Sequence, residues 1–402
     1  MTKHDIIIIG ADPWEHYTWR RRHHVAWNLA KNHRVLFVEP PLTIFQPFRD
    51  IDLSWRHLFN LGKLKHQGRN LYSYSPVRWL PLSIPGSKRF DYYGRDKRRI
   101  FRALKKIVNR LSFQNPVLWV YFNMYQYDYY GLFDEKIVVT DWYDDFSAPS
   151  GCEQSRELVQ SIRKREDLLL EKSNIVFAAS KELFEKLSKR RNEVYLITHG
   201  VEFDNYYNSA RKSSSALMRK LESLKKPVLC FIGTMQAKID FELLKYVSSR
   251  HRDGSLLLIG RRWFNNKDDE NVFDGLIRED NVTYLDEIQN QSIPFCLDYV
   301  DVCLIPFKKM TINYVTSAPL KLLEYFASGK PVVATDLGRS YEFNQLVRVA
   351  DSQEGFVSQI ACALRENNDE GLILKRRKIA EDNSWLKRSQ EMMEVIENSI
   401  NS

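Results

Sequence analysis

The sequence contains few cysteines, and their distribution argues against two common uses of this residue. Only five occur among 402 residues, and no two of them have the Cys-x-x-Cys spacing of a zinc or redox motif. An odd number of scattered cysteines predicts reduced thiols, not a disulfide framework or a zinc site. The five are Cys152, Cys230, Cys296, Cys303 and Cys362.

Long hydrophobic runs are also missing. No segment approaches the roughly 20 uncharged apolar residues that a membrane-spanning helix requires. Residues 6–9 are four consecutive isoleucines followed by Gly10, a run far shorter than the core of a signal peptide. We therefore expect a cytoplasmic protein that is neither secreted nor threaded through a bilayer.

The overall composition is that of an ordinary globular protein. Hydrophobic residues make up 44% of the chain and charged residues 28%, which argues against a mainly disordered chain. At about 150 residues per domain, this length predicts two or three domains. Sixty Lys and Arg against 51 Asp and Glu give a net charge of +9, which favours an anionic partner: phosphate, membrane or nucleic acid.

Short apolar runs recur along the chain, with helical segments between them. Residues 5–10 are a β-branched run closed by glycine, and a helical stretch separates them from a second run at 35–38. Strand, helix and strand at this spacing indicate a βαβ unit of a parallel sheet. A second such series begins at residue 227. The sequence thus predicts two α/β halves joined near residues 203–226, with catalysis in the cleft between them.

The segment around residue 319 carries the most informative motif. Thr316 and Ser317 are suited to cap a helix, and Pro319 suits its first turn. Free N–H groups at such a helix start can bind a diphosphate. Lys321 could add a charge on the phosphates, and Glu324 could accept hydrogen bonds from ribose hydroxyls. The alternative is an ordinary helix packed on a sheet, with Lys321 and Glu324 in solvent.

Residues 319–333 read Pro-x-Lys-x-x-Glu-Tyr-x-Ala-x-Gly-Lys-Pro-Val-Val, which resembles the donor-binding signature of GT-B glycosyltransferases. The similarity covers most of the chain. It lies nearest to enzymes of bacterial polysaccharide assembly and, more distantly, to inverting glucuronosyltransferases of xanthan assembly. The resemblance implies an α/β fold of two Rossmann-like domains facing a central cleft. It places them at residues 1–203 and 227–382, with a linker at 204–226 and a returning helix at 383–402.

Other segments follow this family's order. Residues 231–235 resemble its glycine loop, residues 199–202 the turn that closes the first domain, and residues 383–385 the start of the final helix. Retaining members usually carry a glutamate where this chain has Thr316, so an inverting mechanism is at least as well supported. The resemblance implies a donor, with UDP as its nucleotide, bound by Gly233, Thr234, Thr316, Ser317, Lys321 and Glu324.

An inverting enzyme needs a base to deprotonate the acceptor hydroxyl. Asp144 and Asp145 follow a first-half strand, and similarity to the xanthan enzymes favours one of them as this base, with Asp141 third. Two alternatives stay open: a cluster that caps the next helix, or the metal-binding Asp-x-Asp of a different glycosyltransferase fold. The two-domain pattern argues against the second, so we expect no metal and no cofactor besides the nucleotide sugar.

Polar and aromatic side chains gather after the first strand, where several should face the cleft. Three consecutive arginines at 20–22 would suit an acidic or phosphorylated acceptor. A solvated helix start is the alternative for each residue. The histidines here lack the spacing that would support a metal site. The candidate acceptor-binding residues are Asp12, Trp14, His16, Arg20 and Arg21.

The segment 97–111, from Lys97 to Leu111, has an apolar stripe at helical spacing and a strongly basic opposite face. The segment 79–85, from Trp79 to Pro85, is an apolar loop upstream of it. Together they could rest on an anionic inner leaflet and admit a lipid-linked acceptor. The alternative is that the helix simply packs on its own domain.

Three hypotheses for the whole chain remain. The first is a glycosyltransferase acting on a glycan or lipid-linked acceptor in cell-surface polysaccharide synthesis. The second is an inactive relative that binds a nucleotide sugar or scaffolds an assembly, which Thr316 keeps open. The third is a nucleic-acid-binding protein, which the basic charge prompts, although the sequence has no recognisable RNA or DNA module.

Overall fold

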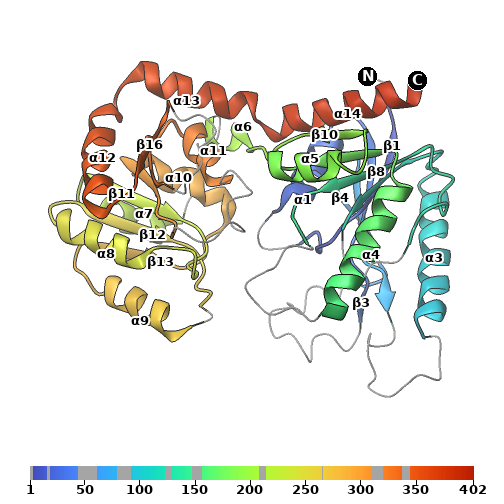
Figure 1. The fold of residues 1–402 in the computed structure, drawn as a ribbon, viewed down its shortest axis with the longest axis horizontal. Helices are drawn as coiled ribbons and strands as arrows, with labels where there is room; N and C mark the ends of the chain where they lie inside the picture. The colour runs from blue at the N-terminus through green and yellow to red at the C-terminus, as the bar shows by residue number, and fades with distance from the viewer. Residues whose placement is uncertain are drawn as a thin grey trace. The chain divides into compact units, whose positions relative to one another are not determined.

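The computed structural model describes residues 3–15, 19–43, 61–78, 92–122, 128–146, 156–207, 214–264, 266–308, 320–336 and 345–402. The chain divides into two compact units (Figure 1). Unit 1 comprises Met1–Thr198 with Leu386–Ser402, and unit 2 comprises His199–Trp385. The segment predicted as a linker, 204–226, carries two helices and lies within unit 2.

Unit 1 is built on a largely parallel sheet whose strands are short hydrophobic runs. The isoleucine run at residues 5–9 forms a central strand, paired in parallel on both sides. Among the described strands of this sheet, only β4 and β5 pair in antiparallel fashion. The spatial order is β10 (Val194–Leu196), β9 (Ile175–Ala178), β8 (Ile137–Trp142), β7 (Val117–Tyr121), β1 (Asp5–Ile9), β2 (Arg34–Val38), β5 (Leu71–Tyr74) and β4 (Leu64–Gly68).

Helices cover both faces of this sheet, which explains why its strands are hydrophobic on both sides. Ile7 and Ile9 belong to the core under α3, α4 and α5, while Phe37 packs against His23 of α1. A short sheet of β3 (Leu42–Thr43) and β6 (Val77–Arg78) lies apart. The helices are α1 (Arg21–Leu29), α3 (Tyr92–Arg110), α4 (Arg156–Lys172), α5 (Lys181–Ser188) and α14 (Trp385–Asn401).

The helix α3 confirms the amphipathic pattern of segment 97–111. Ile100, Leu104 and Val108 are buried in the core of unit 1. The opposite face exposes six cations, Arg98, Arg99, Arg102, Lys105, Lys106 and Arg110. The segment 79–85 lies outside the described residues. Across the described part of the chain, no helix is both long and apolar enough to span a bilayer.

Unit 2 is built on a six-stranded sheet in which every pair of neighbouring strands is parallel. The series of strands predicted to begin at residue 227 is present and starts with β11. The edge strand β16 was not predicted. The spatial order is β13 (Val282–Leu285), β12 (Ser255–Ile259), β11 (Val228–Ile232), β14 (Val302–Ile305), β15 (Val332–Thr335) and β16 (Val347–Ala350).

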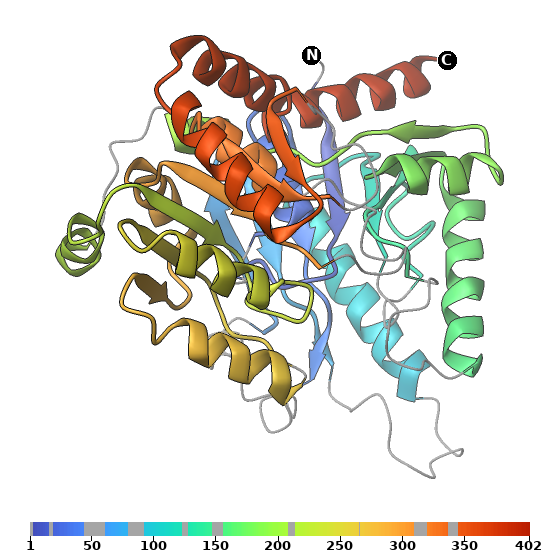
Figure 2. The ribbon, with the colours of Figure 1, turned by 60° about the vertical axis from the view of Figure 1, so that its left-hand side comes forward.

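Alternate side chains of the strands of unit 2 enter two separate cores. Cys230 and Ile232 of β11 pack with α10 and α11, whereas Leu229 and Phe231 pack with α8, α9 and α12. Helices α8 and α12 lie side by side on that second face (Figure 2). The helices are α6 (Phe203–Tyr207), α7 (Ser215–Glu222), α8 (Phe241–Arg250), α9 (Lys267–Leu276), α10 (Ile293–Asp298), α11 (Leu320–Ala327), α12 (Gln353–Glu366) and α13 (Glu370–Asp382), with a 3-10 turn η2 (Asn290–Ser292).

Candidate functional sites in the two units

In unit 2, the carboxyl end of β11 meets the first turn of α11. Gly233 follows β11 with φ +155°, and a Cβ atom built on it would lie 2.5 Å from Cε and 2.6 Å from Nζ of Lys321. A side chain here would displace the end of Lys321, and a φ of +155° disfavours any residue other than glycine. Tyr325 fixes the arrangement, because its hydroxyl oxygen accepts a hydrogen bond from the N–H of Ile232 at 3.0 Å. The structure thus brings together two of the predicted donor-binding residues.

A neighbouring glycine completes the strand end. Gly260 follows β12 with φ +138°, and a Cβ atom on it would lie 2.2 Å from the carbonyl oxygen of Gly233. The N–H of Gly233 donates to the carbonyl of Ile259 at 2.8 Å. Both strands therefore end in backbone without side chains, and this surface lies at the carboxyl edge of a parallel sheet, where such folds bind ligands.

Lys238 is a second cation at this edge, and the sequence analysis did not select it. Burial lowers the pKa of Lys238, and the charge of Lys321 lowers it further. The pKa of Lys321 is also lowered by burial, while Glu324 raises it. Two ammonium groups held near one another and depleted of water favour a polyanion between them. Lys238 lies five residues after Gly233, the glycine that follows β11. This position is the signal that could have revealed Lys238.

The remaining predicted donor residues differ in how they are placed. Glu324 lies one turn after Lys321 and is half-buried, and its charge helps to raise the pKa of Tyr206. Thr234 is exposed directly after Gly233. Thr316 and Ser317 lie outside the described residues. We name the set Gly233, Lys238, Lys321 and Glu324 the lysine cluster.

An aromatic side chain that the sequence analysis also missed lies beyond Gly260. Trp263 is 51% exposed, which is unusual for so large an apolar side chain. The guanidinium of Arg261 lies 5.0 Å from the centre of one of its rings. Its backbone is tied to the loop after Gly233, because its N–H donates to the carbonyl of Met235 at 2.8 Å. An exposed indole offers a face on which a planar base can stack.

In unit 1, the first strand and β8 bring acidic and basic side chains together. Arg22 is 2% exposed and forms an ion pair with Asp12, and its guanidinium lies 4.6 Å from the ring centre of Tyr143. Arg20 is exposed and lies 3.6 Å from the carboxylate of Asp12. Among the predicted acceptor-binding residues that the structure describes, Asp12 and Arg20 lie nearest the surface.

Arg21 and Trp14 lie inside unit 1. The Nε atom of Arg21 donates to both carboxylate oxygens of Asp141, at 2.9 and 2.8 Å, and Nη1 donates to the carbonyl of Thr198 at 2.9 Å. Both charged side chains are buried. Trp14 is buried against Trp19, among other rings. The structure therefore gives Arg21, Trp14 and the third base candidate, Asp141, internal partners, while His16 lies outside the described residues.

The two favoured base candidates have different surroundings. Asp145 accepts a hydrogen bond from Nζ of Lys186, on α5, at 2.6 Å. Asp144 is exposed, and its Oδ1 accepts the N–H of Asp145 at 2.9 Å. Partial desolvation of its carboxylate raises the pKa of Asp144; the Asp145 N–H lowers it, the Asp145 charge raises it, and Arg20 lowers it. Of the two, Asp144 has the surroundings that suit a general base.

Among the residues that the structure describes, no three His, Cys, Asp or Glu side chains gather in a way that could hold a metal ion. The buried thiols Cys230, Cys296 and Cys303 are unpaired, and burial raises the pKa of each. These thiols pack in the core of unit 2.

Comparison with known proteins identifies the fold class of this chain. Residues 226–366 match the family Glycosyl transferases group 1. Across the whole chain, the structure is similar to sucrose-phosphate synthase from Thermosynechococcus elongatus, with a TM-score of 0.66, 16% identity, and 98% and 99% of the two chains covered. It is also similar to HepE from Anabaena in complex with UDP and glucose, with a TM-score of 0.60, 12% identity, and 98% and 100% covered. The chain has the GT-B fold, as predicted, and the segment that matches the family lies within unit 2.

A particular relative is similar in sequence. TuaH of Bacillus subtilis (strain 168), whose name places it in teichuronic acid biosynthesis as a glycosyltransferase, is 27% identical over 263 residues. The match covers 62% of this chain and 64% of TuaH, slightly less than two thirds of that relative. The resemblance to bacterial glycosyltransferases of polysaccharide assembly is thus confirmed. The more distant resemblance to the xanthan enzymes stays a prediction.

Proposed function

We propose that this protein is a glycosyltransferase that transfers a sugar from a UDP-linked donor to a glycan or lipid-linked acceptor in cell-surface polysaccharide assembly. The observation that carries the proposal is the contact of Lys321 with the backbone of Gly233 at the carboxyl edge of the sheet in unit 2. The UDP bound to HepE and the name of TuaH support the donor and the pathway.

In this proposal, the lysine cluster binds the diphosphate. Lys321 and Lys238 supply two positive charges, and the exposed backbone of Gly233 allows the phosphates to approach closely. Glu324 accepts hydrogen bonds from the ribose, and the base stacks on Trp263. Thr316 and Ser317 remain candidates for the same site.

Transfer then requires a base for the acceptor hydroxyl, which we assign to Asp144. Its raised pKa makes it a stronger proton acceptor than an ordinary aspartate, and Arg20 beside it can attract an anionic acceptor. We expect the reaction to invert the anomeric configuration and to need no metal, so a chelator should leave the rate unchanged. The alternative is an inactive relative that binds the donor without transferring its sugar. Loss of transfer in an Asp144 variant separates the enzyme from this inactive relative.

The basic face of α3 supports a membrane surface as the place of the reaction. Its six exposed cations would attract an anionic leaflet, at about 1 kcal/mol for each charge near the surface. We therefore propose a cytoplasmic protein that associates with the inner face of the membrane, where a lipid-linked acceptor is available.

Calorimetric titration with UDP tests the proposal directly. A contact with a charged group contributes about 1.5 to 3 kcal/mol, so Lys321→Ala should weaken UDP binding by about one to two orders of magnitude. Lys375→Ala is the matched control, because it removes an exposed lysine of α13 in the same unit. No heat with UDP, or equal affinity of the Lys321→Ala and native chains, would contradict the proposed site.

A further inference from the structure

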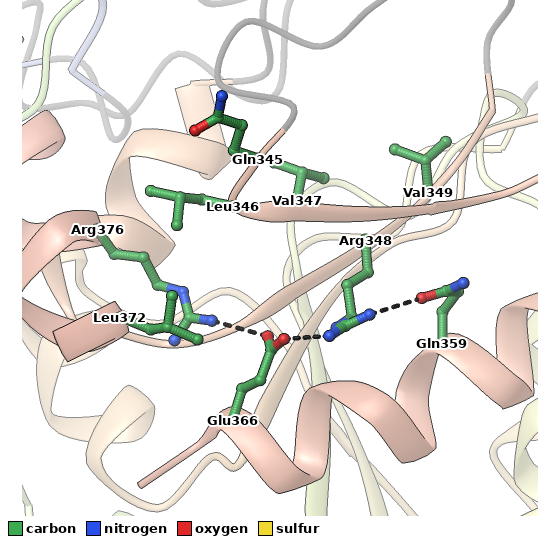
Figure 3. Close-up of a pocket in the computed structure, with 9 residues that line it drawn as sticks. All are labelled: Gln345, Leu346, Val347, Arg348, Val349, Gln359, Glu366, Leu372 and Arg376. Atoms are coloured by element: carbon green, nitrogen blue, oxygen red, sulfur yellow. Dashed lines mark hydrogen bonds and ion pairs between the residues drawn. The ribbon is translucent and has the colours of Figure 1, made fainter. Parts of the chain in front are cut away.

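A cavity of about 260 Å³ lies between β16, α12 and α13 of unit 2 (Figure 3). Its location is the amino edge of the sheet, because Gln345 and Leu346 precede β16 and β16 runs parallel to β15. Gly233 and the lysine cluster lie at the opposite, carboxyl edge. The residues that line the cavity are Gln345, Leu346, Val347, Arg348, Val349, Gln359, Glu366, Leu372 and Arg376.

Two arginines converge on one carboxylate in this cavity. Nη2 of Arg376 lies 3.2 Å from one oxygen of Glu366, and Arg348 forms an ion pair with the other oxygen. Figure 3 shows the carboxylate held between the two guanidinium groups. Nη1 of Arg348 also donates to the amide oxygen of Gln359 at 3.1 Å. The lining therefore contains two positive charges and one negative charge.

Arg376 is the more deeply buried of the two arginines. Its side chain is 1% exposed, and its Nη1 donates to the carbonyl of Gly329 at 3.3 Å. Burial lowers the pKa of Arg376; Glu366 and Asp369 raise it, and Arg348 lowers it. Asp369 is exposed at the start of α13, where Oδ1 accepts the N–H of Leu372, and it does not line the cavity. The Nε atoms of Arg348 and Arg376 are buried without a hydrogen-bond partner.

We propose that this cavity binds a small oxyanion, a carboxylate or a phosphate, beside Glu366, with Arg348, Arg376 and the amide of Gln359 as its donors. An added anion would neutralise the excess positive charge, and guanidinium groups are suited to oxyanions because they donate two parallel hydrogen bonds. Leu346 and Leu372 give the cavity an apolar wall. A volume of about 260 Å³ lies below the roughly 300 to 1,000 Å³ of sites for drug-sized ligands, so the occupant is a small molecule.

The test is calorimetry of the full chain with inorganic phosphate and, separately, with malonate, at constant ionic strength set by sodium chloride. At least one of the two should bind saturably. Arg348→Gln should weaken that binding at least tenfold, while Arg365→Gln, an exposed arginine on the same helix as Gln359, should leave it unchanged. Binding of phosphate alone would assign a phosphorylated occupant, and binding of malonate alone a carboxylate.

Two further measurements keep the outcome unambiguous. Lys321→Ala should retain the Arg348-dependent site, since the lysine cluster lies at the other edge of the sheet. If circular dichroism shows that Arg348→Gln does not fold, Gln359→Leu removes one polar group of the lining instead. The proposal is overturned if neither anion binds, or if the folded variant binds as the native chain does. Failure of UDP to bind would contradict the proposed function and leave this inference standing.

Discussion

At the scale of single residues, the three consecutive arginines at 20–22 show how neighbours in sequence acquire different roles. Arg20 reaches solvent, Arg21 neutralises Asp141 inside the unit, and Arg22 stacks over Tyr143. The sequence indicates only that a basic cluster follows the first strand. Arg21 is the arginine of this cluster that pairs with Asp141, which lies 120 residues later in the chain and is adjacent only after folding.

This difference predicts unequal effects of the two arginines on stability. Arg21→Met should lower the free energy of unfolding by about 3 to 5 kcal/mol, because it leaves the buried carboxylate of Asp141 without a partner. Arg20→Met should change it by less than about 0.5 kcal/mol, because Arg20 is a surface residue. Urea unfolding of both variants provides the measurement. Equal stability of the two would show that Asp141 does not depend on Arg21.

The two adjacent aspartates predict separable effects on the transfer rate. Asp144→Asn should reduce kcat by about 100-fold to 10,000-fold, the usual contribution of a general base, and should leave UDP affinity unchanged. Asp145→Asn should keep most of the activity, because its carboxylate is engaged with Lys186. A larger loss of kcat in Asp145→Asn than in Asp144→Asn would exchange their roles.

The pH profile adds a second readout on the same pair. A base acts only when it is deprotonated, so the rate should rise with pH through the raised pKa of Asp144. The negative charge of Asp145 favours the protonated form of Asp144. Replacing Asp145 by Asn removes this charge, so the pKa of Asp144 should fall. The acid limb of kcat/KM in Asp145→Asn is expected at lower pH than in the native chain. A shift to higher pH would contradict this electrostatic coupling.

At the scale of helices and strands, the sequence predicts most of what the two sheets contain. Runs such as residues 6–9 and 256–259 are apolar on both sides because helices cover both faces of a parallel sheet, and this pattern needs no knowledge of partners. The helix α11 follows from its donor-site motif. By contrast, β16 reads Val-Arg-Val-Ala, and its two central residues are only half-buried at the edge of the sheet, so its sequence gives little signal.

The candidate sites were less accessible from sequence than the fold. Lys321 and Gly233 belong to motifs, and the structure places them in contact. Lys238 and Trp263 lie in loops, where neither periodicity nor capping selects a residue. The preference for Asp144 over Asp145 arises from Lys186 on α5, and no local pattern indicates that a lysine 41 residues later will reach the carboxylate.

The basic face of α3 predicts salt-sensitive binding to membranes. Liposomes containing anionic lipid should sediment the native chain at low salt and release it at high salt, because screening weakens these attractions. A variant in which Arg102, Lys105 and Lys106 become Gln should bind markedly less. The control replaces exposed Lys220, Lys225 and Lys375 of unit 2 by Gln, so the net charge changes equally. Equal sedimentation of both variants would exclude α3 as the docking face.

At the scale of the whole molecule, every described residue of the lysine cluster belongs to unit 2. The isolated segment 199–385 should therefore fold and bind UDP within about tenfold of the full chain, a difference of about 1.4 kcal/mol. It should show no transfer, since Asp144 is absent. Calorimetry of the segment with UDP is the measurement, and loss of binding by a folded segment would show that unit 1 contributes to the donor site.

Unit 1 is discontinuous in the chain, since residues 386–402 complete it after unit 2 has ended. Met392, Met393 and Ile396 are buried there, and Glu397 lies 3.2 Å from His4. During synthesis on the ribosome, all of unit 2 is translated before the last segment of unit 1. The isoleucine strand made at the outset therefore belongs to a unit that is complete only when the final helix has been added.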